Sequence, residues 1–474
     1  MDYVADLHLH SKYSRAVSKD MNLPTMAFWA EKKGLNILST GDWTHPIWIR
    51  EIKQNLEEAE KGLFKLKNEN SKIRFLLSVE ISGIYSQGGK VRRIHNLIFS
   101  PSIETCEKIN ASLVKRGCNL NSDGRPIIGL SAESLIELVL SIDDKAMIIP
   151  CHVWTPWFSL YGSNSGFDSI DECFGKFADK ITAIETGLSS DPYMNWQIKE
   201  LNNRSILSFS DAHSPAKMGR ESTVFELEKL TFDNIKNAIM KPSLKSTTGS
   251  TSIKESSAHS PRGTRDTSDT PDTSRIKYTI EFYPEEGKYH FTGHRNCDYV
   301  QTPEQTRSQG TICPVCKRPL TVGVMHRVED LAKDGFEKEV SKLNSNGVKW
   351  ILDPSKKHPP FVKLVPLNEI IAESLSSTVS SQKVKDAYNN LCEELGNELN
   401  VLLKASVSDI AKNAAHSAGS GQGEKVAEGV EKVRKGEIVM VPGFDGQYGI
   451  VKIWKDIQNK EKPQDLASQL GIDF

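Results

Sequence analysis

Histidines and carboxylates stand at the ends of short apolar runs throughout the first half of the chain. His8 and His10 close the first run, Glu80 ends the third, and Asp211 follows the last. Histidine and carboxylate side chains without cysteine suit Zn²⁺, Mn²⁺ or Fe²⁺ in an open catalytic site. The pattern predicts a metal centre built from nine residues: His8, His10, Asp42, His45, Glu80, His95, His152, Asp211 and His213.

Two of these histidines are spaced so that they can hold one ion together. His8 and His10 lie on the same face of an extended strand, because alternate strand residues point the same way. A carboxylate such as Glu80 can bridge two ions about 3.5–4 Å apart, and such a pair binds both ends of a phosphoryl group. One ion then activates water, and the other stabilises charge on the leaving oxygen. A single histidine at a strand end is usually structural, but packing alone does not explain nine such groups at one rim.

The elements that must position these residues alternate between strand and helix patterns over residues 1–240. Seven short apolar runs separated by helices indicate a parallel βα barrel or sheet, in which ligands gather at the carboxyl ends of the strands. His95 fits this arrangement least well, since it precedes its run. The expected strands cover residues 3–8, 36–40, 75–80, 95–99, 146–152, 181–185 and 205–210, and the expected helices cover 24–33, 49–66, 132–141 and 232–240.

Changes in composition divide the chain into four parts. Residues 1–243 form the predicted barrel domain, and the Ser/Thr-rich residues 244–274 have the composition of a linker. Residues 275–328 are predicted to form a small module with β-like runs at 276–283 and 319–325 and a helix start at 302–304. Residues 329–474 are predicted to be mostly helical, with an apolar stripe over 384–402 and a final hairpin around Asp445-Gly446.

A second group of metal ligands lies in the small module. His294-x2-Cys297 and Cys313-x2-Cys316 form two knuckles with residues 298–312 between them. Thiolates and an imidazole at this spacing predict a tetrahedral structural zinc, with His290 as the alternative fourth ligand. Because the module lacks a visible core, we expect the metal to supply much of its folding energy.

The composition excludes several classes of protein. With 60 basic and 61 acidic residues the formal net charge is −1, so any DNA-binding surface must come from local charge segregation. No run of about 18 apolar residues is present, so we expect no membrane span. The first residues carry neither a basic nor an apolar signal region, so we expect a cytoplasmic protein with reduced thiols.

The order of the motifs resembles that of a known superfamily. DLHLHSKYS, TGDWTH, SVEIS, RIHNL, PCHVW and FSDAHSP are similar, in order, to the motifs of the polymerase-and-histidinol-phosphatase (PHP) superfamily of metal-dependent phosphoesterases. The resemblance implies an α/β fold, a distorted seven-stranded (βα) barrel. It also implies one ion on His8, His10, Glu80 and Asp211, a second on Glu80, His95 and His152, and a third position served by His213 and the Asp42 loop. Two frequent histidines of the superfamily are Trp43 and Arg15 here, with His45 as the nearby replacement.

Within the superfamily, the chain most closely resembles the endonuclease Q family, which joins such a barrel to a zinc module and a helical C-terminal region. The likeness includes PCHVWTPWFSLYGS, GKYHFTGHRNC, CPVCKRPLTVGVMHRVEDLA and VPGFDGQYG, and spans nearly everything except the linker. It implies a DNA repair endonuclease that cuts the phosphodiester 5′ of uracil, hypoxanthine, xanthine or an abasic site. It further implies two or three divalent ions (Zn, Mn or Mg) in the barrel and one structural zinc.

An enzyme of this kind must pull the damaged base out of the stack, so its pocket needs aromatic walls and phosphate contacts. Side chains near the ligand motifs are the candidates for this substrate binding: Lys12, Arg15, Trp43, Arg93, Trp154, Trp157 and Arg220, with Trp48, Phe158 and Tyr161 as further aromatic walls. Asp211, Glu80, Asp42 and His213 are the candidates for catalysis.

Other functions are compatible with the same barrel. A phosphomonoesterase of the histidinol-phosphate kind would use the same ligands, although it would not need the second half of the chain. A helicase-associated phosphoesterase and a non-catalytic DNA-binding subunit are further alternatives, and the intact ligand set argues against the latter. The sequence does not identify a sliding clamp or a helicase as partner, nor the preferred lesion, the metal or the oligomeric state.

Overall fold

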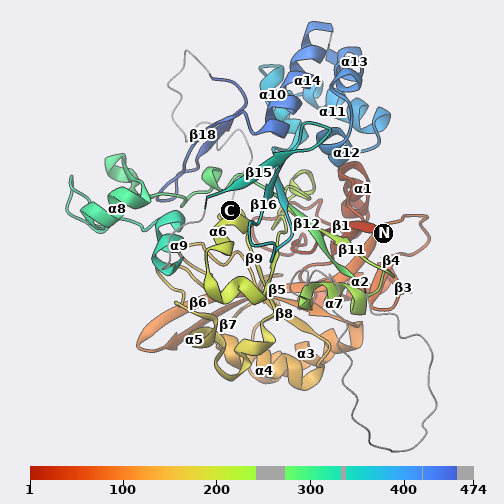
Figure 1. The fold of residues 1–474 in the computed structure, drawn as a ribbon. Coiled ribbons are helices and arrows are strands. Elements are labelled where there is room, and N and C mark those ends of the chain that lie inside the picture. The colour runs from red at the N-terminus through yellow and green to blue at the C-terminus, as the bar shows by residue number, and fades with distance from the viewer. Residues whose placement is uncertain (242–272, 333–337, 419, 456–474) are drawn as a thin grey trace, which may run out of the picture.

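The computed structural model describes residues 1–241, 273–332, 338–418 and 420–455. Of the predicted linker, residues 244–272 lie outside the described residues, and residues 273 and 274 are described. A large mixed sheet runs through the molecule, and the C-terminal helices gather at one end of it (Figure 1). Among the described residues, no helix has both the length and the apolar character needed to cross a bilayer.

Seven strands of the first half form a closed ring. They are, in order around the ring, β1 (Asp2–Asp6), β2 (Ile37–Ser39), β5 (Arg74–Gln87), β6 (Lys90–Ser100), β8 (Met147–Pro150), β9 (Ala183–Glu185) and β10 (Ser205–Leu207). A hydrogen bond from the Val153 amide to the Glu185 carbonyl joins β8 to β9. A bridge between Leu9 and Ala212 joins the residues that follow β10 to those that follow β1. All seven predicted strands are present, and their ring is the distorted barrel that the motifs imply.

The ring is mixed rather than parallel. β6 runs antiparallel to both β5 and β8, so the predicted all-parallel arrangement is wrong at this strand. The reason is local: Gly88 and Gly89, both with positive φ, close a tight turn between β5 and β6 where a parallel pair would need a long crossover. The returning strand pairs His95 with Ser82, two residues beyond Glu80. Because β6 runs antiparallel to β5, the start of β6 lies at the same rim as the carboxyl end of the Glu80 strand segment. His95, which precedes the apolar run of β6, therefore lies at this rim.

Capping residues set most helix ends in the barrel region. The Asn22 side chain accepts a hydrogen bond from the Thr25 amide at the start of α1 (Leu23–Lys33), and Gly34 ends this helix with φ 89°. Further helices here are α3 (Ile103–Lys115), α4 (Ala132–Ile142), α5 (Ile170–Phe174), α6 (Pro192–Trp196) and α7 (Phe232–Met240). The helices predicted at 24–33, 132–141 and 232–240 are confirmed, and α3 was not predicted.

The helix predicted over residues 49–66 is wrong in its second half. α2 (Pro46–Asn55) ends at residue 55, and β3 (Leu56–Glu60) and β4 (Leu63–Leu66) follow as an antiparallel hairpin. Gly62, with φ 73°, makes the turn. Helical spacing and strand alternation place the same leucines on a buried face, so periodicity alone could not separate the two structures.

The sheet continues on the other side of β1. β11 (Ser222–Glu226) pairs with β1, and β12 (Arg275–Glu281) pairs with β11, both antiparallel. The predicted first strand of the small module is thus bound by main-chain hydrogen bonds to the barrel sheet. β17 (Phe361–Lys363), β16 (Lys349–Leu352) and β15 (Val340–Leu343) then extend the same sheet. The short β7 (Ile127–Ile128) pairs parallel with β5.

The small module contains few regular elements. Thr302 and Gln305 form a capping box at the start of α8 (Pro303–Gln309), so the predicted helix start is confirmed. The run over 319–325 is not a strand; it makes isolated bridges and then enters α9 (Val324–Ala332). The remaining hairpin consists of β13 (Thr292–His294) and β14 (Tyr299–Gln301).

Five helices make up most of the C-terminal region: α10 (Leu367–Ser374), α11 (Gln382–Glu394), α12 (Glu398–Leu403), α13 (Val407–Ala418) and α14 (Ser420–Lys435). The predicted apolar stripe is divided between α11 and α12, because Gly396 adopts φ 93° and Asn397 caps α12. The final hairpin of β18 (Val439–Val441) and β19 (Ile450–Lys452) forms around Asp445-Gly446 as predicted.

A buried ion pair fixes the helical region to the barrel. Glu398, at the start of α12, binds the Nζ atom of Lys33 at 2.7 Å, and both side chains are almost fully buried. The same carboxylate accepts hydrogen bonds from the Tyr388 hydroxyl at 2.7 Å and from the Leu367 amide at 3.0 Å. The Glu398 carboxylate therefore links α12 to three other helices: α1, α10 and α11.

Glu398→Ala should lower the free energy of unfolding by about 3–5 kcal/mol, because it leaves the Lys33 ammonium buried without its partner. Urea denaturation followed by circular dichroism measures the change. Lys108→Ala, which breaks the exposed Lys108–Glu104 pair on α3, is the control and should leave the transition unchanged. Equal midpoints for Glu398→Ala and the unmodified protein would contradict this account of the attachment.

Candidate metal centre and cleft

Four ligand-type atoms converge beyond the carboxyl end of β1. His10 Nε2 lies 3.2 Å from Glu80 Oε2 and 3.0 Å from Asp211 Oδ1. His8 Nε2 lies 3.6 Å from each of the same two oxygens. Two imidazoles and two carboxylates at this separation are a suitable donor set for a single divalent ion.

A second group forms on the other side of Glu80. Its Oε1 atom lies 3.0 Å from His152 Nε2 and also contacts His95 Nδ1, and these two nitrogens are 3.2 Å apart. Glu80 therefore directs one oxygen into each group. A carboxylate placed in this way could serve two ions, one in each group.

One further carboxylate holds a histidine of each group. Glu185 lies 2.9 Å from His8 Nδ1 through Oε1, and its Oε2 atom accepts a hydrogen bond from the His152 amide at 2.9 Å. An imidazole that donates from one nitrogen presents the other as a ligand, so Glu185 leaves His8 Nε2 directed at Glu80. The two ligand groups are thus positioned together by one buried side chain.

Asp42 has the same relation to His10. Its Oδ1 atom lies 3.1 Å from His10 Nδ1, while Oδ2 accepts hydrogen bonds from the Ser11 amide and hydroxyl and from the Ser14 hydroxyl. Both carboxylate oxygens are therefore engaged. Asp42 orients a ligand and does not face the cleft.

Buried charges at this place compensate one another. Burial would raise the pKa of Glu80, but the neighbouring His95 and Arg125 hold it well below its usual range. Burial would lower the pKa of His8, but Glu185 above all raises it well above its ordinary value. The carboxylates thus attract positive charge, which a divalent ion supplies in place of protons. The His8 Nε2 atom, buried and without a hydrogen-bond partner among the described residues, fits such an ion.

Three residues of the site have left-handed backbones. Asp42, His152 and Asp211 adopt φ values of 49°, 33° and 47°. A non-glycine residue with positive φ is strained, so it keeps this conformation only where neighbouring contacts restrain it. Backbone strain of this kind is found most often at functional sites. The Glu185 bond to the His152 amide is one such restraint.

Besides Asp42, two further residues of the predicted metal centre lie outside both groups. The ring of His45 stacks on Tyr13 with centroids 4.6 Å apart. His213 directs Nδ1 at the Asp211 carbonyl at 2.9 Å and packs against the His10 ring. Within the described part of the chain, neither residue joins a cluster of ligand atoms, so the geometry gives no support to the predicted third ion.

A cleft of about 620 Å³ opens over the second ligand group, with His95, His152 and Asp211 in its wall. Four of the predicted substrate-binding residues line it: Arg15, Arg93, Trp157 and Arg220. Phe158, whose ring lies 4.8 Å from that of His95, lines it as well.

The other predicted substrate contacts lie elsewhere. Trp43 and Trp154 are 0% and 1% exposed, so they fill the core instead of forming a wall of the cleft. The Trp154 ring stacks on that of Tyr161 with centroids 4.7 Å apart, and its Nε1 atom donates to Asn195 Oδ1 at 2.8 Å. Lys12 pairs with Glu51 at 3.0 Å, away from the cleft lining.

The far wall of the cleft comes from the second half of the chain. Tyr289 packs edge-to-face on Trp157 at 5.7 Å, and Lys288 Nζ lies 4.5 Å from the centre of the Tyr448 ring. Tyr448 belongs to the turn between β18 and β19, which is held to the module by a hydrogen bond from the Gly446 amide to the Lys288 carbonyl. The C-terminal hairpin therefore completes the cleft.

Several of these residues were not predicted from the sequence. Glu185 ends the sixth predicted strand, so its position at a carboxyl end was an available signal. Arg125, Tyr289 and Tyr448 lie outside the first-half ligand motifs, and only the folded chain brings them to the cleft.

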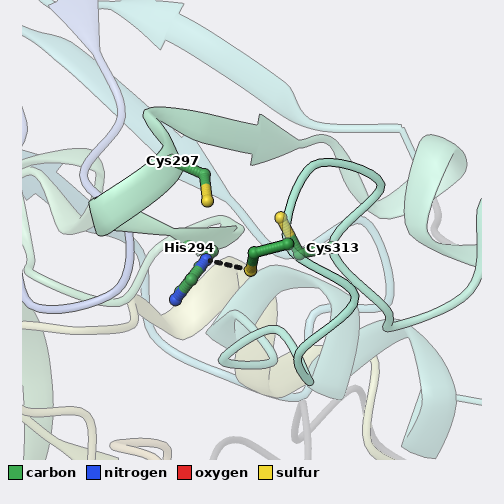
Figure 2. Close-up of side chains that lie close together, drawn as sticks. His294, Cys297 and Cys313 are labelled. Carbon is green, nitrogen blue, oxygen red and sulfur yellow. Dashed lines mark hydrogen bonds between the residues drawn. The ribbon is translucent and has the colours of Figure 1, made fainter.

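The predicted zinc ligands lie together in the small module. His294 ends β13, Cys297 closes the following turn, and their side chains point toward Cys313 (Figure 2). Cys316 Sγ lies 3.3 Å from His294 Nδ1, and all four ligand atoms form one group. Burial opposes ionisation of Cys313, but backbone amides of Cys316 and Val315 lower its pKa to about 6. The thiolate, which is the form that binds metal, is thus favoured there.

Comparison with known proteins gives matches over parts and over the whole of the chain. A family model described as the MJ0043 C-terminal domain matches residues 366–437. The chain is 30% identical over 338 residues to an uncharacterized protein of Methanocaldococcus jannaschii, MJ0043. That alignment covers 68% of the chain and 35% of MJ0043, so the chain spans about a third of the length of this relative.

Two solved structures match almost the entire chain. The crystal structure of the lesion-specific endonuclease PfuEndoQ from Pyrococcus furiosus superposes with a TM-score of 0.73 and 30% identity, over 99% of both chains. An endonuclease Q complex with a 27-mer duplex that carries an abasic lesion at the active site gives a TM-score of 0.74 and 31% identity. It covers 98% of this chain and 100% of that one.

Glu185→Gln should weaken metal binding by about 10- to 100-fold, because an amide cannot accept hydrogen bonds from His8 and His152 through both atoms. Metal content after dialysis against a competing chelator measures the effect. Glu200→Gln is a matched control, since Glu200 also accepts one side-chain and one backbone hydrogen bond but contacts no predicted ligand. Equal metal retention in both variants would show that Glu185 has no positioning role.

Cys313→Ser should remove one zinc ion per chain, because a hydroxyl replaces the thiolate with the lowered pKa. Zinc released by a thiol reagent and measured with a coloured chelator gives the count. Cys118→Ser, outside the four-residue group, should retain the full zinc content. Unchanged zinc in Cys313→Ser would exclude Cys313 as a ligand.

Proposed function

The chain belongs to the endonuclease Q family, and we propose that it is a metal-dependent endonuclease that hydrolyses DNA beside damaged bases. The observation that carries this proposal is the bridging position of Glu80 below an open cleft. A carboxylate shared by two groups of imidazole and carboxylate ligands is the arrangement of a two-metal phosphoesterase. The likeness to a lesion-specific endonuclease covers 99% of both chains and supports damaged DNA as the substrate.

We assign two divalent ions to the barrel. The first is held by His8, His10, Glu80 and Asp211, and the second by Glu80, His95 and His152. A structural zinc is held by His294, Cys297, Cys313 and Cys316. When bound, the barrel ions supply the Lewis acidity that activates water and neutralises charge on a phosphate.

The protein's own residues fix the geometry of this reaction. Glu185 and Asp42 hold His8 and His10 in the ring orientation that leaves both Nε2 atoms for the first group. The Ser82 hydroxyl, 3.0 Å from Nε2 of His95, leaves Nδ1 of that ring for the second group. In the hydrolysis, a water oxygen forms a bond to phosphorus, one ester P–O bond breaks, and the proton ends on the departing oxygen.

The cleft has the size and lining for one displaced nucleotide. Ligand pockets for small molecules span about 300–1,000 Å³, and the cleft falls within this range. A base that leaves the duplex is held by stacking between aromatic or apolar side chains. Trp157, Phe158, Tyr289 and Tyr448 provide such walls, and Arg15, Arg93 and Arg220 provide positive charge for the DNA backbone. We therefore propose duplex DNA with a deaminated base or an abasic site as the substrate.

The protein should nick an end-labelled duplex on the 5′ side of a single deoxyuridine, hypoxanthine or abasic site and leave the undamaged duplex intact. The assay is run with Mg²⁺, Mn²⁺ and Zn²⁺ in turn. Asp211→Asn should lower the nicking rate by more than about 100-fold, the upper range for residues that only orient ligands.

The matched control is Asp233→Asn, an exposed residue of α7 paired with Lys61, which should nick at the unmodified rate. Equal nicking of damaged and undamaged duplexes would indicate a general nuclease. Efficient hydrolysis of a phosphomonoester without any nicking would replace the endonuclease with a small-molecule phosphatase.

A further inference from the structure

Arg125 lies against the bridging carboxylate. Its NH1 atom donates to Glu80 Oε2 at 3.1 Å, the oxygen that faces His8 and His10. The side chain is 26% exposed and lines the cleft. A permanent positive charge is therefore present at the place where the two ligand groups meet the cleft.

The loop that carries Arg125 is fixed to the strand that carries Glu80. The Ser82 amide donates to the Pro126 carbonyl at 3.0 Å, and Ile127 pairs with Ser82 in the parallel register of β7 and β5. The Arg125 amide donates to Asp123 Oδ1 at 3.1 Å. These hydrogen bonds fix the backbone of residues 125–127. The sheet therefore sets where the Arg125 side chain starts relative to Glu80.

The guanidinium keeps donors for a further partner. It carries five N–H groups in a rigid fork, and Glu80 is its one hydrogen-bond partner among the described residues. A planar fork that faces a cleft is suited to an oxygen of a phosphate. The Glu80 contact uses the NH1 side, which leaves the remaining donors available to the cleft.

The residues predicted to serve a third ion join no cluster of ligand atoms within the described part of the chain. Both oxygens of Asp42 are hydrogen-bonded, His45 stacks on Tyr13, and His213 binds the Asp211 carbonyl. Arg125 supplies a permanent positive charge beside the carboxylate that the two ligand groups share.

We propose that Arg125 contacts a non-bridging oxygen of the scissile phosphate and stabilises its charge during hydrolysis. The inference rests on the proposed endonuclease function. It makes Arg125 a catalytic residue, whereas Arg15, Arg93 and Arg220 contact the rest of the DNA backbone.

The test uses the full-length, metal-loaded protein and duplexes whose scissile phosphate is a single phosphorothioate diastereomer. Sulfur weakens a contact made by Arg125 or by a Mg²⁺ ion. A softer ion such as Zn²⁺ or Cd²⁺ restores the rate only where an ion makes the contact. The diastereomer that no softer ion rescues should therefore mark the oxygen bound by Arg125.

Arg125→Met should slow nicking by about 10²–10³-fold, the loss expected for one preorganised donor to a developing charge. In this variant the rate ratio between the oxygen and the unrescued sulfur substrates should fall towards one. Arg125→Lys should recover part of the rate. Metal content of both variants should stay at two barrel ions and one zinc, which separates a lost phosphate contact from a lost ion.

Arg93→Met is the matched control, since Arg93 lines the same cleft over Phe158 without contacting a predicted ligand. It should weaken DNA binding and keep the sulfur discrimination. An unchanged ratio in Arg125→Met, or a loss of barrel metal in that variant, would overturn the role of Arg125 and leave the endonuclease intact. Failure of the unmodified protein to nick damaged DNA would overturn both.

Discussion

The carboxylate of Glu80 is fully buried between two groups of histidines. Burial of an unpaired charge costs more free energy than the net stability of a folded domain. Each oxygen of Glu80 must therefore meet positive charge, and the barrel brings His8 and His10 to one side and His95 and His152 to the other. Glu185 then fixes a histidine from each side. The antiparallel strand β6 carries His95, and the buried carboxylates of Glu185 and Asp42 orient His8 and His10, so each of these features positions a side chain around Glu80.

Residues from the second half of the chain line the same cleft as the ligand groups, as the proposed DNA substrate requires. β12 binds the module to the barrel sheet, and the β18–β19 turn is bound to the module, so Tyr289 and Tyr448 line the same cleft as His95 and His152. The Lys33–Glu398 pair connects the helical region to α1 in the same way. A phosphatase of small molecules would need none of these attachments. They support the reading of the whole chain as one DNA-processing unit.

Much of this was visible in the sequence because metal ligands are constrained in type and place. The ends of predicted strands indicated that Glu80, Asp211 and the first two histidines lie together, and the knuckle spacing indicated the same for the Cys/His group. The spacing of apolar residues does not show in which direction a strand runs, so the antiparallel orientation of β6 was not predicted. The same spacing fits a helix or a hairpin, so the hairpin after α2 was not predicted either. It also could not separate an aromatic residue that lines a cleft from one that fills the core, as Trp157 and Trp43 illustrate. Arg125 lies in a loop that only the folded sheet places at the bridge.

Electron paramagnetic resonance of the Mn²⁺-loaded protein tests the central claim most directly. A carboxylate that bridges two ions about 3.5–4 Å apart holds them close enough for magnetic coupling. The account predicts the spectrum of a coupled manganese pair at two equivalents per chain, and its replacement by uncoupled signals in Glu80→Gln. Uncoupled signals alone in the unmodified protein, at the same loading, would contradict a bridge at Glu80.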